Sequence, residues 1–413
     1  MEILESATLT DRGLRMADNE DGVLERPQVP LFVVADGTGG TAPARVCLEV
    51  LGRSAELLAS HGAQVAAHPD TAARLAVGRH FEEVFAAAGR AIREEAATRA
   101  AAEAAVAVAA TVMGPFAFVA HVGNARAYLW RQGRLRCLTV DHTLAQQQLR
   151  RGEITAKEFA TSPYRKTLTQ ALGATPSVHP DIAEVQLASG DVFLLCSDGL
   201  HRAIPEREIA RTLAEHERLA DAARRLVEAA NGAGGKDNIS LSLFRIGSGP
   251  DEAPAGKAVD VARALGQVFL FKGLSDAERL HVAPYFEQAT YEAGATLCVE
   301  GELGDSFFLV VSGKVDVTHG QAKLIGLGPG DYAGEIALAR EGPRTASLTA
   351  RKRTQVLILT RARFLELIRR RPRLGARLVM PLLANVGDRI VDLRARLGAV
   401  QAVISGGEGD AAL

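Results

Sequence analysis

Apolar runs and amphipathic stretches alternate along the first 246 residues of the chain. The apolar runs are short and rich in β-branched and aromatic residues, and they predict strands at 31–35, 116–122, 127–130, 192–196 and 239–246. Helices are predicted at 44–60 and over an alanine-rich segment at about 81–108, because alanine is the best helix former. Strands and helices mix without a strict βαβ rhythm, which predicts an α+β fold packed in layers.

A small, polar, proline-punctuated stretch at 247–261 interrupts this pattern and is the best candidate for a linker. Beyond it the pattern predicts a helix at 276–283, short strands with glycine turns between 286 and 359, and two terminal helices. This order is typical of a small β-roll with helical ends. We therefore expect domains at 1–246 and 262–399, and a disordered tail at 400–413.

Composition narrows the classes of function. The 413 residues suggest two or three domains, and 48 basic and 49 acidic residues leave a formal net charge of −1. This balance gives no global field to attract nucleic acid or an anionic membrane. The four cysteines lie far apart, no basic and apolar leader is present, and no uncharged apolar run reaches the ~18 residues that span a bilayer. We expect a cytoplasmic protein with no nucleic-acid or membrane partner.

Turns that contain glycine and an acidic residue follow two predicted strands and precede a third. Asp36 and Asp198 follow apolar runs, Asp237 precedes one, and Glu20 and Asp21 lie near the N-terminus. Magnesium and manganese prefer hard oxygen ligands, so carboxylates gathered at strand ends are typical of such a site. Two ions about 3.5–4 Å apart can share a carboxylate, acidify a bridging water and clamp a phosphoryl group. Taken singly, each Asp-Gly pair is also ordinary turn chemistry.

The order of the motifs adds information that no single turn provides. The motifs are Thr10-Asp11-Arg12-Gly13, Asn19-Glu20-Asp21, Val34-Ala35-Asp36-Gly37-Thr38-Gly39-Gly40, 120–129, Asp141-His142-Thr143, 168–173, Ser197-Asp198-Gly199-Leu200 and Asp237-Asn238-Ile239. This series resembles the bacterial branch of the metal-dependent protein phosphatases, type 2C, over about residues 1–246. The resemblance implies a β-sandwich flanked by helices, with a dinuclear Mg²⁺ or Mn²⁺ site that hydrolyses phosphoserine and phosphothreonine.

The same resemblance implies roles for the acidic residues. Asp36 is implied to bridge the two ions. Glu20 and the Gly37 carbonyl are implied to bind one ion, and Asp198 and Asp237 the other. Asp21 is implied to support this set of ligands. Asp36, Asp198 and Asp237 are then the catalytic carboxylates, and Arg15 is the candidate that binds the substrate phosphate. His142 is either a general acid or a residue that stabilises its turn.

Three positions depart from the family pattern. Met16 stands where the family has its phosphate-binding arginine, and a shift of one residue on a strand turns a side chain to the other face. Either a β-bulge restores Arg15 to the site, or Arg12 or Arg15 reaches the phosphate differently, or phosphate binding is weakened. Asn124 and Arg202 replace acids that help hold a third metal in the family. We expect the third ion to be absent and hypothesise that Arg202 fills its place as a fixed positive charge.

A second anion-binding pattern lies beyond the linker. Gly334 and Glu335 precede a predicted short helix, and Arg344 follows after a loop. Free amides at a helix start and a guanidinium both favour a cyclic phosphate, while Glu335 can accept a hydrogen bond from a ribose hydroxyl. A surface ion pair between Arg344 and Glu335 is the alternative.

The surrounding sequence looks like a cyclic nucleotide-binding domain over about residues 262–385. The segments that carry this likeness are 271–275, 300–308, 311–315, 328–338 and 342–346. The likeness assigns Glu335 to the ribose and Thr345 to the phosphate or a purine edge. It assigns Arg344 and the Ala337 amide to the phosphate, and Gly334 belongs to the same binding segment. Both cyclic AMP and cyclic GMP fit this pattern.

The last predicted helix, 374–397, carries an apolar stripe that is typical of a packing face. A lid over the nucleotide and a dimerising coiled coil are its two functional versions. We thus predict a metal-dependent phosphoprotein phosphatase regulated by cyclic nucleotide, which can form a homodimer through this helix. The alternatives are a catalytically weak phosphatase-like binding protein whose nucleotide domain switches a protein interaction, and a nucleotide-independent domain that only dimerises.

Overall fold

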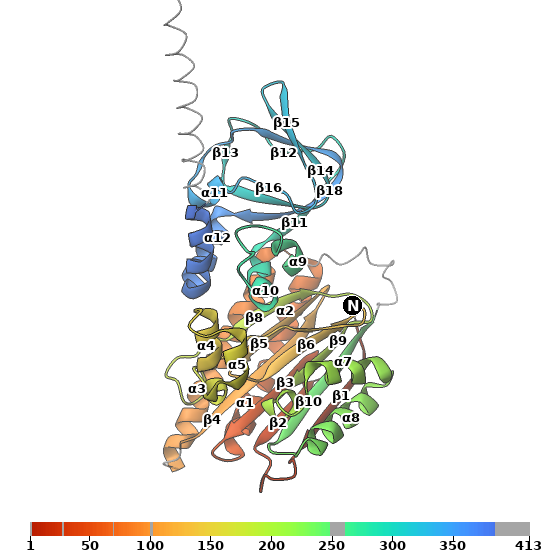
Figure 1. Cartoon of the computed structure of the whole chain (residues 1–413), viewed down its shortest axis with the longest axis vertical. Coiled ribbons are helices and arrows are strands. Elements are labelled where there is room, and N and C mark those ends of the chain that lie inside the picture. Colours follow the sequence, from red (N-terminus) through yellow and green to blue (C-terminus); the bar gives the residue numbers. More distant parts are fainter. Residues whose placement is uncertain (1, 27–28, 69, 100–101, 248–260, 385–413) are drawn as a thin grey trace, which may run out of the picture. The chain divides into compact units, whose positions relative to one another are not determined.

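The computed structural model describes residues 2–26, 29–68, 70–99, 102–247 and 261–384 (Figure 1). The chain divides into two compact units. One holds Met1–Ala262 together with Asp276–Pro284, and the other holds Arg263–Ser275 and the chain from Tyr285 onward. The predicted linker lies outside the described residues except at its two ends, and the predicted tail at 400–413 lies outside them entirely.

Two five-stranded sheets, antiparallel throughout, form the centre of the first unit. One sheet has the order β1 (Glu2–Asp11), β10 (Ile239–Gly247), β9 (Val192–Cys196), β6 (Arg126–Arg131), β7 (Arg134–Cys137). The other has the order β2 (Asp21–Arg26), β3 (Leu31–Thr38), β4 (Ala104–Met113), β5 (Phe116–Val122), β8 (Asp181–Gln186). All five predicted strands of this half are confirmed.

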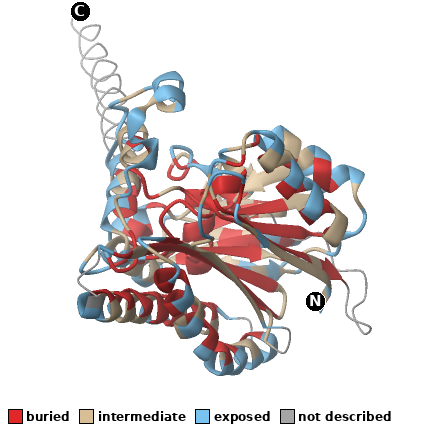
Figure 2. Cartoon of the chain, turned by 90° about the horizontal axis from the view of Figure 1, so that it is seen from below, coloured by how far each residue is buried: buried red, intermediate tan, exposed pale blue. Residues whose placement is uncertain are grey.

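Helices pack on the outer faces of both sheets, and Figure 2 shows buried residues along the strands and exposed residues on the outer sides of the helices. The sheet that contains β3 is covered by α1 (Ala42–Arg53), α2 (Ala55–Ala67) and α3 (Thr71–Arg99). The other sheet is covered by α6 (Asp198–His201), α7 (Glu206–Glu215) and α8 (Leu219–Gly232). Between β7 and β8 lie α4 (Leu144–Arg150), α5 (Ala156–Thr161) and the short η1 (Pro163–Lys166). The α+β sandwich flanked by helices is therefore confirmed.

Strand β3 shows how sequence sets these layers. Leu31, Val33 and Ala35 belong to the apolar cluster beneath α1, α2 and α3, whereas Phe32 and Val34 belong to the cluster between the two sheets. Successive side chains on a strand point to opposite faces, so a strand buried on both faces is a continuous apolar run. The apolar run ends at Ala35, and the strand continues through Asp36 to Thr38, which places the carboxylate near its end.

The alanine-rich segment at 81–108 is only partly the predicted helix. Helix α3 ends at Arg99, and the alanines that follow lie in β4, a central strand. The valines of β4 face the other sheet together with Ala110, while Ala105, Ala107 and Ala109 face the helices. Close packing between a sheet and a helix layer favours these small side chains and overrides alanine's helix propensity. The predicted helix at 44–60 is also two helices, which meet at Ser54.

The second unit is a β-roll with helices at its ends, as predicted. Its strands are β11 (Glu287–Tyr291), β12 (Thr296–Cys298), β13 (Leu303–Gly304), β14 (Ser306–His319), β15 (Ala322–Leu327), β16 (Tyr332–Ala333), β17 (Gly342–Pro343) and β18 (Ser347–Thr360). Its helices include α9 (Val261–Leu265), which starts in the first unit, α11 (Ile336–Ala339) and α12 (Arg361–Arg370). The predicted helix at 276–283 is confirmed as α10 (Asp276–Val282) and η2 (Ala283–Tyr285), but Asp276–Pro284 groups with the first unit.

The last helix is described only in part. Residues 372–384 are helical, and Leu378 and Leu382 of the predicted stripe are buried. The remainder of that stripe, from Val386 to Leu397, lies outside the described residues. None of the described helices is long and apolar enough to cross a membrane.

Candidate functional site

The motifs that contain Asp21 and Asp36 meet at the end of the β2–β3 pair. Asp21 and Asp36 are directly opposed partners in the register of these strands. The Gly37 amide donates to the Glu20 carbonyl at 3.2 Å, which holds Glu20 beside the turn. A Cβ at position 37 would lie 2.7 Å from that carbonyl oxygen, so glycine is needed for the close approach.

Asp198 and Asp237 come from neighbouring strands of the other sheet. Asp198 begins α6 directly after β9, and Asp237 lies just before β10. A Cβ on Gly199 would lie 1.9 Å from the Asn238 carbonyl oxygen, so only glycine lets these two turns touch. The edges of the two sheets thus bring carboxylates from four segments together.

The electrostatics of these carboxylates show that they share one site. Burial, followed by the charges of Asp198 and Asp237, raises the pKa of Asp21 to about 7 despite hydrogen bonds from serines. Burial also raises the pKa of Asp36 well above its ordinary range, and the charges of Asp21, Asp198, Asp237 and Glu20 add to the effect. Like charges held together out of water destabilise their ionised forms. A bound cation would remove this repulsion.

The donor set fits a hard divalent cation. Every side chain assigned to the metals offers carboxylate oxygen, and Oδ2 of Asp21 is buried without a hydrogen-bond partner among the described residues. Carboxylate, carbonyl and water oxygens suit magnesium and manganese, whereas zinc favours nitrogen and sulfur. These residues are therefore able to hold such ions, and the individual ligand assignments stay predictions.

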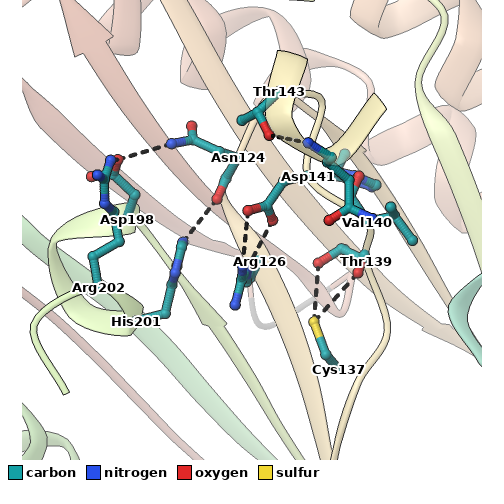
Figure 3. Close-up of polar contacts among 12 residues, drawn as sticks. Asn124, Arg126, Cys137, Thr139, Val140, Asp141, Thr143, Asp198, His201 and Arg202 are labelled. Carbon is teal, nitrogen blue, oxygen red and sulfur yellow. Dashed lines mark hydrogen bonds and ion pairs between the residues drawn. The ribbon is translucent and has the colours of Figure 1, made fainter. Parts of the chain in front are cut away.

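Asn124 and Arg202 both bond to one oxygen of Asp198 (Figure 3). The Asn124 amide donates to Oδ2 at 2.8 Å and the Arg202 guanidinium donates to the same atom at 3.0 Å. Nε2 of His201 lies 2.9 Å from the backbone carbonyl oxygen of Asn124, so the backbone at this residue is also held. Two residues that depart from the family pattern thus act together on one predicted metal ligand.

Arg15 lies in a turn, so the argument from strand faces does not apply to it. Strand β1 ends at Asp11, and the amides of Leu14 and Arg15 both donate to the Gly235 carbonyl. The Arg15 side chain is exposed beside the loop that leads to Asp237. A residue in a turn has no alternating faces, so the offset to Met16 does not exclude Arg15 from binding phosphate.

Sequence reasoning missed the role of Asn238. Its buried side chain accepts from the Glu20 amide at 2.9 Å and donates to the carbonyls of Arg12 and Asp18 at the same distance. This one amide group ties the loop at 12–20 to the start of β10 and so positions Glu20. An asparagine placed between Asp237 and an apolar strand was the only signal available.

His142 occupies a structural position rather than an exposed one. The ring stacks on His121 with centroids 4.7 Å apart, and its Nδ1 accepts from the Gly123 amide at 3.2 Å. Its Nε2 lies 3.4 Å from Oδ2 of Asp181. Of the two predicted roles, stabilisation of the turn agrees better with this buried and engaged ring.

In the second unit, the arginine, the glycine and the acidic residue of the cyclic nucleotide pattern lie together. Gly334 has φ +82°, and a Cβ there would lie 2.9 Å from Nη1 of Arg344. Arg344 donates to the Ser306 carbonyl at 2.7 Å, and its guanidinium carbon lies 5.2 Å from the centroid of the Phe308 ring. Glu335 is buried beside this group. A guanidinium held by a carbonyl and a ring is preorganised for an anion.

Two predicted ligands of the phosphate differ from this picture. The Ala337 amide donates to the Gly334 carbonyl at 3.1 Å, so it is already engaged within the turn. Thr345 is exposed, and its carbonyl lies 3.2 Å from Nδ1 of His319. Both assignments therefore stay predictions.

Comparisons with known proteins agree with both halves. The family model described as Stage II sporulation protein E (SpoIIE) matches residues 28–247, and the cyclic nucleotide-binding domain model matches residues 288–371. The serine/threonine phosphatase stp of Listeria monocytogenes is 33% identical over 243 residues, which cover 57% of this chain and 92% of that protein.

Solved structures give the same result. The PPM Ser-Thr phosphatase MsPP of Mycobacterium smegmatis, crystallised with cacodylate, has a TM-score of 0.50 and 32% identity, and covers 60% of this chain and 100% of its own. The catalytic domain of the phosphatase PstP, crystallised with two manganese ions, has a TM-score of 0.50 and is 26% identical. The match covers 60% of this chain and 99% of the PstP chain. The chain thus belongs to the SpoIIE-type, metal-dependent serine/threonine protein phosphatases, and it carries a C-terminal cyclic nucleotide-binding domain.

Proposed function

We propose that the chain hydrolyses phosphoserine and phosphothreonine in proteins at the carboxylate cluster, and that cyclic nucleotide bound to the second unit regulates this activity. The convergence of Asp21, Asp36, Asp198 and Asp237, which raises the pKa values of Asp21 and Asp36, is the observation that supports the first part. Two Mg²⁺ or Mn²⁺ ions would lower the pKa of a bridging water and polarise the phosphoryl group.

The protein's own groups have distinct parts in this proposal. Asp36 would bridge the two ions, Glu20 and the Gly37 carbonyl would hold one of them, and Asp198 and Asp237 would hold the other. Asp21 supports Asp36 across the β2–β3 pair. Arg15 binds the substrate phosphate from the turn after β1. Arg202 contributes a fixed positive charge beside Asp198, where a phosphoryl group would carry negative charge.

Hydrolysis of p-nitrophenyl phosphate and of a phosphothreonine peptide in Mn²⁺ tests the catalytic proposal. Asp36→Ala and Asp198→Ala should each lower kcat by at least about a hundredfold, because each removes a ligand of the proposed ions. Equal turnover by wild type and both variants would favour the phosphatase-like binding protein instead.

The proposed ligand of the second unit is cyclic AMP or cyclic GMP. Arg344, together with Gly334 and the Ala337 turn, would hold the phosphate, Glu335 would hold the ribose, and Thr345 would contact the phosphate or a purine edge. Calorimetry with each nucleotide tests this assignment. Arg344→Ala should weaken binding by about tenfold or more, since a charge-assisted hydrogen bond contributes about 1.5–3 kcal/mol. Absence of binding to wild type would favour the domain that only dimerises.

The C-terminal helix bears on the assembly state. Met380 and Leu383 are exposed on its described part, whereas Leu378 and Leu382 are buried. This pattern suits both a lid and a homodimer interface, and light scattering with and without nucleotide separates the two.

A further inference from the structure

Helix α10 belongs to the phosphatase unit although the chain on both sides of it belongs to the other unit. Asp276–Pro284 groups with Met1–Ala262, whereas Arg263–Ser275 and the chain from Tyr285 form the second unit. The match to the cyclic nucleotide-binding family begins only at residue 288. A change in the second unit therefore reaches α10 through both of its ends by covalent continuity.

An ion pair fastens α10 to α4, the first helix of the segment between β7 and β8. Glu278 is 3% exposed, and its Oε1 accepts from Nη2 of Arg150 at 2.7 Å and from Nε at 3.1 Å. Leu280 on the same helix lies in the apolar cluster between the two sheets. A buried carboxylate needs its cationic partner, so α10 and α4 are held in one arrangement.

A histidine cluster fastens α10 to the turn at Asp141-His142-Thr143. Oδ2 of Asp181, at the start of β8, lies 3.4 Å from Nε2 of His142 and 3.9 Å from Nδ1 of His281 on α10. His121, His142 and Asp181 also have the residue types of a metal site, with ligand atoms within 4.8 Å of one another.

The hydrogen bonds of His142 argue against a metal in this cluster. Its Nδ1 accepts from the Gly123 amide, so the ring proton lies on Nε2 and points toward Asp181. A metal would need the lone pair of that same Nε2. The cluster is therefore a polar contact between α10 and the phosphatase fold.

From His142 the contacts lead directly to a predicted metal ligand. The His142 amide donates to the Gly123 carbonyl at 2.8 Å, and the Gly123 amide donates back to the ring. Gly123 has φ +96°, and a Cβ there would lie 2.1 Å from Cγ1 of Val106, so this residue has little room to shift. The next residue, Asn124, bonds to Oδ2 of Asp198.

We propose that α10 transmits the nucleotide state of the second unit to the phosphatase site. One route runs from Glu278 through Arg150 to α4. The other runs through Asp181 and His142 to Asp198. This inference rests on the proposed function. Release or tightening of α10 shifts α4 and the turn at His142 together, because one helix holds both. His142 is in this scheme a positioning residue.

Glu278→Gln in the full chain tests the first route, with Asp276→Asn as the matched control. Both replace an acid on α10 by its amide, but Asp276 is 53% exposed and pairs with Arg279 of the same helix. The readout is the ratio of kcat/KM for a phosphothreonine peptide with and without saturating cyclic AMP or cyclic GMP. Calorimetry measures nucleotide binding by the same samples.

In the wild-type chain, saturating nucleotide should either raise or lower kcat/KM by at least about fivefold, which lies within the usual range of allosteric coupling. Glu278→Gln should bring the ratio close to one, because an α10 released from α4 also loosens its hold on the turn at His142. The nucleotide Kd should change by less than about threefold, and Asp276→Asn should retain the wild-type ratio. Arg150→Gln should reproduce the loss, and the double variant should add nothing further, as expected for one shared contact. Tryptophan fluorescence verifies that each variant is folded.

A wild-type ratio retained by Glu278→Gln and Arg150→Gln would overturn the inference. So would a ratio of one in a wild-type chain that both hydrolyses the peptide and binds nucleotide. Absence of hydrolysis, or absence of binding, would instead overturn the proposed function on which the inference rests.

Discussion

The acidic cluster should make the metal-free protein less stable at high pH, and Asp21→Asn should remove this effect. Burial and the neighbouring carboxylates raise the pKa of Asp21 to about 7 in the folded protein. An unfolded chain has an aspartate pKa of about 3.9. Between these two values the folded state keeps a proton that the unfolded chain has released, so stability falls as pH rises through that window.

The magnitude follows from the difference between the two pKa values. It corresponds to at most about 4 kcal/mol of unfolding free energy lost by pH 8. Asparagine carries no charge at any pH, so metal-free Asp21→Asn should exceed wild type by up to that amount at pH 8 and match it at pH 4. For a unit of this size, the gain corresponds to about 8–16 °C in Tm.

Thermal unfolding in a chelator at pH 4 and pH 8 measures this difference. Trp130, the only tryptophan in the chain, lies in β6, so its fluorescence reports the phosphatase unit alone. Asp18→Asn is the control, because Asp18 is an exposed acid of the neighbouring loop. Saturating Mn²⁺ should stabilise wild type more than Asp21→Asn. The convergence of charges would be refuted if the metal-free Asp21→Asn protein were no more stable than wild type at pH 8. It would also be refuted if the variant gained the same stability at both pH values.

Two further variants test the surroundings of Asp198. Arg202→Ala should lower kcat by about tenfold, because it removes a charge-assisted hydrogen bond of about 1.5–3 kcal/mol from Asp198 and the fixed positive charge beside the phosphoryl group; an unchanged kcat at saturating Mn²⁺ would contradict this. Gly199→Ala should weaken Mn²⁺ binding by at least about tenfold and destabilise the fold by about 1–3 kcal/mol, because its Cβ would strike the Asn238 carbonyl. Gly232→Ala is the calorimetric control, since nothing lies within 4 Å of a Cβ there; equal Mn²⁺ affinity in both glycine variants would count against close packing of the two turns.

Five of the ten strands of the phosphatase unit, β3, β5, β6, β9 and β10, were predictable because they are largely buried on both faces. A run such as 31–35 has no polar side and can only be an inner strand or a buried helix, and its short length favours the strand. Strand β4 was missed because its alanines have high helix propensity, although valine recurs at 106, 108 and 112. The period of two was present in the sequence but was weak beside the alanine content.

The candidate site was predictable as a set of residue types and far less so as a geometry. Acidic turns at strand ends identify Asp36 and Asp198, because a turn after a buried strand lies at the edge of a sheet. The sequence gives no sign that the Asn238 side chain bonds to the Glu20 amide, since the two residues are far apart and each is ordinary in its own loop. Such long-range contacts depend on the pairing of strands, which only the folded structure determines.

Asn124 and Arg202 illustrate the same limit with a consequence for chemistry. Along the sequence they are separate departures from a family pattern, each open to interpretation as drift. In the structure both donate to Oδ2 of Asp198. Burial and the charge of Asp198 raise the pKa of Asp237, and the charge of Arg202 partly opposes that rise. If the two acidic residues had been lost independently, there would be no reason for both replacements to donate hydrogen bonds to the same oxygen of Asp198. The pair therefore favours a site in which a fixed guanidinium offsets part of the carboxylate charge, and a structure in high Mn²⁺ with an ion between Asn124 and Arg202 would contradict that conclusion.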